Sequence, residues 1–180
     1  MEIIDEPLPG LKLVKPKVFH DKRGYFFESY NKAAFQKTGI TDEFVQDNES
    51  LSQKGVVRGL HFQYGEFAQS KLVCVTRGAV LDVAVDLRKD SPAYGQHFAV
   101  ELNDENKYRL YLPKGFAHGF ATLKNNTLFT YKCSAFYNPQ FEDGIIHDDP
   151  DLQIVWPFQQ AEVSPKDQNL QRFRDFQSPF

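Results

Sequence analysis

The chain has 180 residues, and 21 Lys and Arg against 24 Asp and Glu give it a net charge of −3. This length fits one domain spanning residues 1–180, and 41% hydrophobic residues is an ordinary globular composition. No apolar run approaches the roughly 20 residues of a membrane span, the N-terminus lacks a signal-peptide pattern, and no basic block stands out. These features argue against a membrane protein and a nucleic-acid-binding protein, and they predict a cytoplasmic location.

Most of the chain reads as short strands separated by turn signals, which is typical of a sandwich or barrel. The clearest strand is 81–87, where the odd positions are all aliphatic and the even ones are Asp, Ala and Asp. It follows a strand at 71–76 across Arg77-Gly78, which predicts a hairpin turn. The other predicted strands are 11–19, 24–30, 43–48, 56–63, 97–102, 108–112, 117–123 and 127–137.

Only two short helices are expected. Residues 31–38 begin with Asn31 as an N-cap and are followed by Gly39 as a terminator. Pro165 suits the first position of a second helix after Ser164. Dense strands without alternating helices argue against a parallel α/β sheet. The sequence therefore predicts an antiparallel all-β jelly roll with a few short peripheral helices.

The two cysteines, Cys74 and Cys133, are too few for a disulfide framework. Each lies in an apolar stretch, where a buried free thiol is the usual finding. We therefore predict two free, buried thiols rather than a disulfide or a metal-bound pair.

Polar side chains on the faces of predicted strands need a reason, because burial of an unpaired polar group is costly. Three such groups are an imidazole (His61), an ammonium (Lys71) and a phenol (Tyr131). Arg58 and His61 are three positions apart, so an unbroken strand would point them to opposite faces. Gly59 lies between them and predicts a bulge or sharp twist that brings both to one pocket.

Residues 113–118 have the spacing Pro-x-Gly-x-x-His, which resembles the second signature of the cupin superfamily. Many cupins bind a divalent metal through two His and a Glu of an earlier segment together with this later His. Here the earlier segment reads His61-Phe62-Gln63, and no Glu follows at the usual spacing. His61 and His118 supply two ligands, whereas a tight site needs three or four. We therefore expect no metal and no other cofactor.

A narrower resemblance rests on motifs such as Arg58-Gly-Leu-His61-Phe-Gln63 and Ser164-x-Lys166-Asp167. Together with segments 21–28, 44–48, 82–88, 113–120 and 131–132, in this order and with compatible spacing, they resemble the dTDP-4-dehydrorhamnose 3,5-epimerase family. The match runs from about residue 8 to about residue 167. It implies a metal-free cupin jelly roll of nucleotide-sugar biosynthesis.

The resemblance implies conversion of dTDP-4-dehydro-6-deoxy-D-glucose to dTDP-4-dehydro-L-rhamnose by inversion at C3 and C5. Both carbons flank the C4 ketone, so both protons are lost to the same kind of enolate. Each inversion needs a base on one face of the ring and an acid on the other. By resemblance, His61 is the base, Asp167 orients it, Tyr131 is the acid, and Lys71 stabilises the enolate oxygen.

The resemblance also implies a set of substrate-binding side chains: Arg23, Glu28, Gln46, Asp47, Asn48, Arg58, Lys71, His118, Tyr137, Glu142 and Lys166. Arg23 and Arg58 suit the diphosphate, because a guanidinium can bind it bidentately. Glu28 suits the thymine N–H, and Tyr137 suits stacking on the base. In the family, segment 23–28 reaches into the neighbouring subunit's pocket, which implies a homodimer with shared sites.

Some features depart from the family or leave alternatives open. His147 stands where the family more often has Trp-Asn-Asp, which predicts a change in local packing. A relative that inverts only C3 or only C5 keeps the same His and Tyr, so the motifs do not exclude it. A 3,4-ketoisomerase fits the motifs less well. A non-catalytic cupin that binds nucleotide sugars would need no complete set of base, acid and oxyanion partner.

Overall fold

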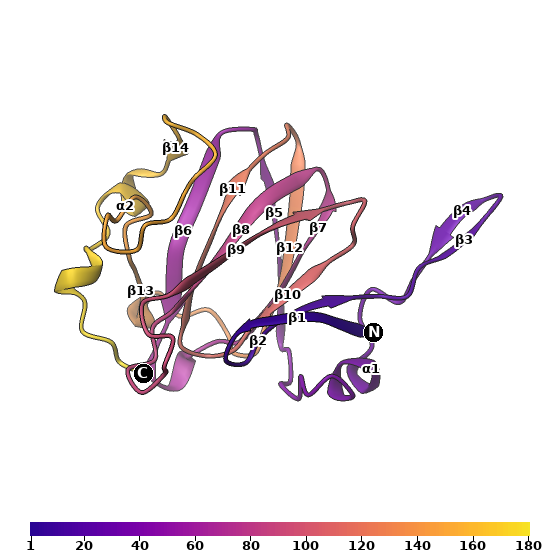
Figure 1. Cartoon of the computed structure of the whole chain (residues 1–180), viewed down its shortest axis with the longest axis horizontal. Coiled ribbons are helices and arrows are strands. Elements are labelled where there is room, and N and C mark those ends of the chain that lie inside the picture. The colour runs from indigo at the N-terminus through magenta and orange to yellow at the C-terminus, as the bar shows by residue number, and fades with distance from the viewer.

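The computed structural model describes residues 1–180 and contains two large β-sheets that face each other (Figure 1). The first sheet has the order β1 (Glu2–Leu8), β2 (Leu11–Lys15), β10 (Arg109–Leu112), β7 (Lys71–Arg77), β12 (Thr127–Cys133), β5 (Gln46–Ser52). The second has the order β13 (Glu142–Gly144), β6 (Val56–Gln63), β11 (Phe116–Thr122), β8 (Ala79–Asp86), β9 (His97–Asn103). All these pairs are antiparallel, and only the short β14 (Glu162–Val163) pairs with β6 in parallel. The predicted all-β jelly roll is confirmed.

The remaining elements are short and peripheral. A hairpin of β3 (Phe19–Asp21) and β4 (Gly24–Phe26) projects from the body of the molecule (Figure 1). The helices are α1 (Lys32–Gln36), α2 (Pro165–Gln168) and the 3₁₀ turns η1 (Gly65–Phe67), η2 (Pro139–Phe141) and η3 (Phe173–Asp175). Asn31 caps α1 and Pro165 begins α2, as the sequence predicts, and the Ser164 side chain caps α2. None of these helices has the length and apolar character required to cross a membrane.

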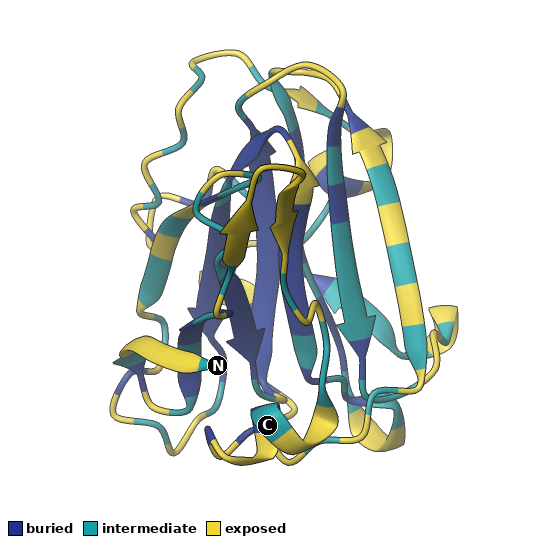
Figure 2. Ribbon diagram, turned by 90° about the vertical axis from the view of Figure 1, so that its right-hand side faces the viewer, coloured by how far each residue is buried: buried dark blue, intermediate teal, exposed yellow.

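Three apolar clusters hold the sheets and their coverings together, and the buried strands at the centre of Figure 2 carry most of them. The largest lies between the two sheets and includes Leu110, Phe120 and Phe129. A second cluster covers the outer face of the second sheet, where C-terminal residues such as Phe176 pack on β6 and β8. A third lies under α1, where Phe35 packs on the outer face of the first sheet.

Strand β8 has the alternation expected from the sequence, but its aliphatic face is turned away from the space between the sheets. Val83 and Val85 pack under the C-terminal segment. The opposite face, which carries Asp82, looks into the space between the sheets, where Val80 and Ala84 join the central cluster. This orientation places a carboxylate in the interior because the second sheet is covered on both sides.

The hairpin predicted at Arg77-Gly78 is wrong. Strands β7 and β8 belong to different sheets, so Arg77-Gly78 is a corner at which the chain passes from the first sheet to the second. Gly78 has a φ of +89°, and its N–H donates to the Asp104 carboxylate. A glycine followed by an alternating strand is compatible with a corner between sheets as well as with a hairpin. Only the pairing of the strands distinguishes these two cases.

Several predicted boundaries also need correction. The predicted strand 11–19 ends at Lys15, and 24–30 shortens to β4. The predicted strand 43–48 moves to 46–52, and 127–137 ends at Cys133. Strand β1 was not predicted, because most of its side chains are exposed and its sequence lacks a hydrophobic pattern.

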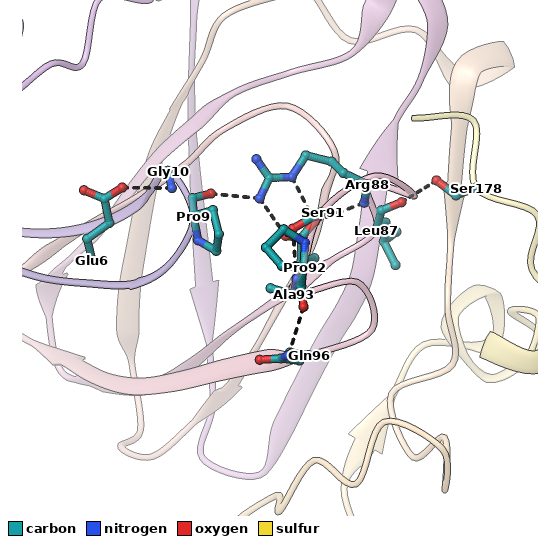
Figure 3. Close-up of polar contacts among 11 residues, drawn as sticks. Glu6, Pro9, Gly10, Leu87, Arg88, Ser91, Pro92, Ala93, Gln96 and Ser178 are labelled. Atoms are coloured by element: carbon teal, nitrogen blue, oxygen red, sulfur yellow. Dashed lines mark hydrogen bonds and ion pairs between the residues drawn. The ribbon is translucent and has the colours of Figure 1, made fainter.

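The end of β8 is tied to both termini of the chain (Figure 3). The Arg88 guanidinium donates to the buried Asp86 carboxylate and to the Pro9 carbonyl oxygen. The Ser178 hydroxyl donates to the Leu87 carbonyl oxygen, which fixes the C-terminal segment to the same turn. Asp86 is thus a structural carboxylate with its own cation.

Candidate active site

A cavity of about 570 Å³ opens between the two sheets. Side chains from both sheets and from α2 line it, and those singled out from the sequence are Arg58, His61, Lys71, His118, Tyr131, Lys166 and Asp167. Seven of the expected site residues, far apart in the chain, therefore meet in one place.

An irregularity in β6 brings Arg58 and His61 to the same cavity. Gly59 has a φ of +107°, and the register between β6 and β11 shifts beside it. A Cβ at Gly59 would lie 2.6 Å from both the Gly119 Cα and the His118 carbonyl oxygen. The irregularity predicted from the spacing is confirmed, and its close backbone packing requires glycine.

His61 on β6 pairs with Asp167 of α2, whose backbone N–H is held by the Ser164 cap. His61 Nε2 lies 2.8 Å from Asp167 Oδ1, and the Gly59 N–H donates to the other carboxylate oxygen at 3.1 Å. Burial raises the pKa of Asp167, but these hydrogen bonds outweigh it and leave the pKa below its usual value. The carboxylate therefore keeps the proton of His61 on Nε2, and Nδ1 remains free to accept another.

Tyr131 and Lys71 face His61 from the opposite sheet, on β12 and β7. Burial raises the pKa of Tyr131, so its phenol holds its proton at neutral pH. Burial lowers the pKa of Lys71, and no carboxylate forms an ion pair with its ammonium. The Lys71 Nζ lies 5.8 Å from the centre of the Tyr131 ring.

The rim of the cavity carries a second polar group of three side chains. The Tyr137 hydroxyl donates to Glu142 at 2.9 Å, and the Lys166 ammonium bonds to the same carboxylate oxygen. Burial raises the pKa of Glu142, but the bonds from Lys166 and Tyr137 bring it below its usual value. The expected base-stacking and diphosphate-binding groups are thus already in contact.

Strand β5 presents its polar side chains alternately to the cavity side and to the outside. Gln46 and Asn48 share the inner side and bond to each other at 3.0 Å, and Gln46 also accepts from the Tyr137 N–H. Asp47 lies on the opposite face, paired with Lys132 at 2.8 Å. The period of two thus turns the Asp47 side chain away from this cavity, and its expected part in substrate binding stays a prediction.

Arg23 and Glu28 also lie outside the cavity. Arg23 is on the projecting hairpin and pairs with Asp21, while Glu28 accepts from Asn31. Within one chain, therefore, the expected binding set is divided into a part at the cavity and a part on the hairpin.

Asp82 is a site residue that the sequence analysis did not single out. It is fully buried on β8, and both its oxygens accept from His118 Nε2, at 3.2 and 3.0 Å. The signal was present in the sequence, since Asp82 occupies a polar position in the clearest strand. The aliphatic face of that strand looked like the inner one, which left Asp82 without an apparent partner.

Two further expectations have structural outcomes. Both cysteines are buried and free, as predicted. His147 packs near Trp156, whose indole N–H donates to the His147 carbonyl oxygen, so its loop has a packing role of its own. No group of three or more His, Cys, Asp or Glu side chains is arranged to hold a metal ion.

Comparisons with known proteins agree with this geometry. The family model described as dTDP-4-dehydrorhamnose 3,5-epimerase matches residues 5–175. The Salmonella typhimurium dTDP-4-dehydrorhamnose 3,5-epimerase is 50% identical over 169 residues, covering 93% of this chain and 92% of that protein. The crystal structure of the Elizabethkingia anophelis enzyme of the same name superposes with a TM-score of 0.93 at 46% identity, covering 97% of each chain.

A second solved structure was determined with a nucleotide sugar. It is the Legionella pneumophila dTDP-6-deoxy-D-glucose-3,5-epimerase in complex with dTDP-4-keto-L-rhamnose, and its TM-score is 0.91 at 47% identity. The match covers 95% of this chain and 92% of that one. The chain described here therefore belongs to the dTDP-4-dehydrorhamnose 3,5-epimerase family and is an isomerase with that family's cupin jelly roll.

Proposed function

We propose that this protein inverts C3 and C5 of dTDP-4-dehydro-6-deoxy-D-glucose, with His61 as the base and Tyr131 as the acid, to give dTDP-4-dehydro-L-rhamnose. The observation that carries the assignment of roles is that the two side chains come from opposite sheets and line one cavity. A hexose held between them meets a proton acceptor on one face and a proton donor on the other. Inversion requires this arrangement, because a single group would return the proton to the face it left.

The protonation states support the same roles. Asp167 holds the Nε2 proton of His61, which leaves Nδ1 to take a proton from carbon and stabilises the imidazolium that forms. Tyr131 keeps its proton until the enolate needs it, because burial raises its pKa. After each inversion, a proton passes from His61 to solvent and another reaches Tyr131, so the enzyme returns to its starting state.

Lys71 supplies the positive charge that the enolate oxygen at C4 needs. Its ammonium makes no ion pair within the chain and lies beside the Tyr131 ring. Because the ketone is shared by both reactions, one cation in this position serves C3 and C5 alike. An ammonium in a partly buried cavity stabilises a developing negative charge more strongly than one in water.

Arg58, Lys166 and the inner side chains of β5 bind the nucleotide diphosphate. Arg58 is held by a bond from Nε to the Ser52 hydroxyl at 3.2 Å, which leaves the rest of the guanidinium for phosphate oxygens. Tyr137 is half-open at the rim, where its ring can stack on thymine. A bound diphosphate then competes with the Glu142 carboxylate for the Lys166 ammonium.

A homodimer completes the site. Arg23 and Glu28 lie outside their own chain's cavity, and the hairpin beside them exposes the aromatic rings of Phe19, Tyr25 and Phe26. Exposed aromatic side chains on a projecting hairpin favour contact with another chain. A second copy is the partner that would receive Arg23 and Glu28 at its cavity. The cytoplasmic location stays a prediction from the sequence.

The test is proton exchange in D₂O with dTDP-4-dehydro-6-deoxy-D-glucose, followed by NMR. We expect deuterium at both C3 and C5 with the native protein, and neither with His61→Asn, which should still bind dTDP. Deuterium at one carbon only would show that the protein is a single-site epimerase rather than a double epimerase. Tight dTDP binding with no exchange in the native protein would make it a binding protein.

A further inference from the structure

A second imidazole–carboxylate pair lies in the same cavity as the first. His118 on β11 lies opposite His61 on β6 in the strand register, and its Nε2 bonds to Asp82 as Nε2 of His61 bonds to Asp167. His118 is 7% exposed and Asp82 is 0% exposed. Burial of a carboxylate is costly, and the proposed function assigns no role to Asp82.

Asp82 has no structural partner that explains it. The only hydrogen bonds that its carboxylate makes within the chain are those from His118, and its charge also raises the pKa of Lys71. Asp86, on the same face of β8, is different, because Arg88 and Ser91 both donate to it. One buried carboxylate of this strand anchors a turn, whereas the other contacts only a side chain of the cavity.

The bond to Asp82 fixes which nitrogen of His118 carries a proton. A carboxylate accepts, so Nε2 donates. Nδ1 makes no hydrogen bond within the chain and is not sealed from the cavity. The His118 ring lies nearly parallel to that of Phe129, with centroids 5.9 Å apart, and this contact limits its rotation.

Other ionisable side chains line the cavity together with His118. Asp82 supports the His118 ring from behind, and the ionisable groups that line the cavity with it are Arg58, His61, Lys71, Tyr131, Glu162, Lys166 and Asp167. A neutral ring with its proton on Nε2 presents an acceptor at Nδ1.

We propose that Asp82 is a positioning residue that keeps His118 Nδ1 as a hydrogen-bond acceptor for a hydroxyl of the hexose. The inference rests on the proposed function, since the substrate carries hydroxyls at C2 and C3, beside the reacting carbons. A fixed acceptor there orients the sugar ring between His61 and Tyr131. The two imidazole–carboxylate pairs thus have the same arrangement. His61 takes protons from carbon, and His118 orients the sugar ring.

The test is a double-mutant cycle with Asp82→Asn and His118→Gln, with kcat, KM and dTDP binding measured separately. An amide can donate to Nε2, so Asp82→Asn permits the wrong tautomer. We expect Asp82→Asn to lower kcat/KM by about 10–100-fold, as loss of other histidine-orienting groups does. In the His118→Gln background we expect a further change of less than about twofold, because residues that act as one unit are not additive. In both backgrounds dTDP binding should change by less than about twofold, since the dyad contacts the sugar.

Asp86→Asn is the matched control, because it changes another buried carboxylate of the same strand. It should lower the melting temperature while leaving kcat/KM near the native value. If Asp82→Asn fails to fold, ¹⁵N NMR of the native His118 ring provides the test, and a proton on Nδ1 would overturn the proposal. A full loss repeated in the His118→Gln background would also overturn it, because Asp82 would then act through another group such as Lys71. Double exchange by the native protein in D₂O tests the proposed function separately.

Discussion

His61 and His118 have the same hydrogen-bonding pattern, in which Nε2 bonds to a carboxylate. The two carboxylates differ in their surroundings. Asp167 lies on the short helix α2 at the cavity edge, and its carboxylate also accepts a hydrogen bond from the Gly59 N–H. Asp82 is fully buried in the second sheet, and its carboxylate accepts hydrogen bonds only from His118. At the residue scale, each imidazole has one nitrogen held by a carboxylate and one left for the substrate.

Replacing Tyr131 by Phe removes the donor on one face of the sugar and leaves His61 on the other. His61 can then take a proton from carbon and return one to the same face. We therefore expect Tyr131→Phe to lower product formation by about 10²–10⁴-fold while deuterium still enters the unconverted substrate. NMR of the sugar in D₂O measures both. Tyr137→Phe, which changes a rim phenol, should act mainly on KM, and product formation unaffected by Tyr131→Phe would remove the acid assignment.

At the scale of elements, strand β6 shows how a local irregularity creates a site. A regular strand would turn Arg58 and His61 to opposite faces, and the positive φ of Gly59 with its register shift prevents this. The same glycine packs against the backbone of β11, so the irregularity is held on both sides. The phosphate-binding and proton-accepting groups therefore depend on one residue that carries no side chain.

Gly59→Ala should be strongly destabilising. The added Cβ would meet backbone atoms at 2.6 Å, and the φ of +107° is unfavourable for alanine. We expect a loss of about 3 kcal/mol in the free energy of unfolding, measured with urea. Gly55→Ala is the control, because its φ of +95° carries the same kind of cost while its Cβ would meet nothing within 4 Å. Equal losses in the two variants would contradict the role given to close packing at Gly59.

At the scale of the whole molecule, the expected binding set is split between the cavity and the projecting hairpin. Lys166, Arg58 and Asn48 lie at or beside the cavity, whereas Arg23 and Glu28 lie on or just after the hairpin. The proposed assembly of each site from two chains would account for this separation. If each site is shared between two chains, two inactive variants should complement each other in a mixed dimer.

Arg23→Ala and His61→Asn should each be nearly inactive alone and should recover activity when their unfolded chains are mixed and refolded together. In a mixed dimer one shared site carries both changes and the other carries neither. With equal amounts of each chain, about a quarter of the sites should be intact, and kcat per chain should approach that fraction of the native value. Mixing folded homodimers without subunit exchange is the control. No recovery after co-refolding would mean that each site lies within one chain.

The strand pattern and the turn signals were sufficient to predict an all-β jelly roll, the Asn31 cap, the start of a second helix at Pro165 and the free cysteines. The pairing of His61 with Asp167 was implied only by the family resemblance. Strand ends were predicted less well, because exposed edge segments such as β1 carry little periodicity. The corner at Gly78 was predicted as a hairpin, since local sequence specifies a turn but not the sheet that the next strand joins. Asp47 was placed with its neighbours in a motif, although strand alternation turns it outward.

The sequence by itself determined the chemistry that this protein carries, because the identity and spacing of its imidazoles, phenol and cations are local properties of the chain. The tertiary structure decided which of these groups meet. His61 and Tyr131 face each other because the two sheets pack together, and Asp82 is buried behind His118 because the C-terminal segment covers the other side of β8. Those outcomes depend on burial by residues distant in sequence, which no local pattern contains.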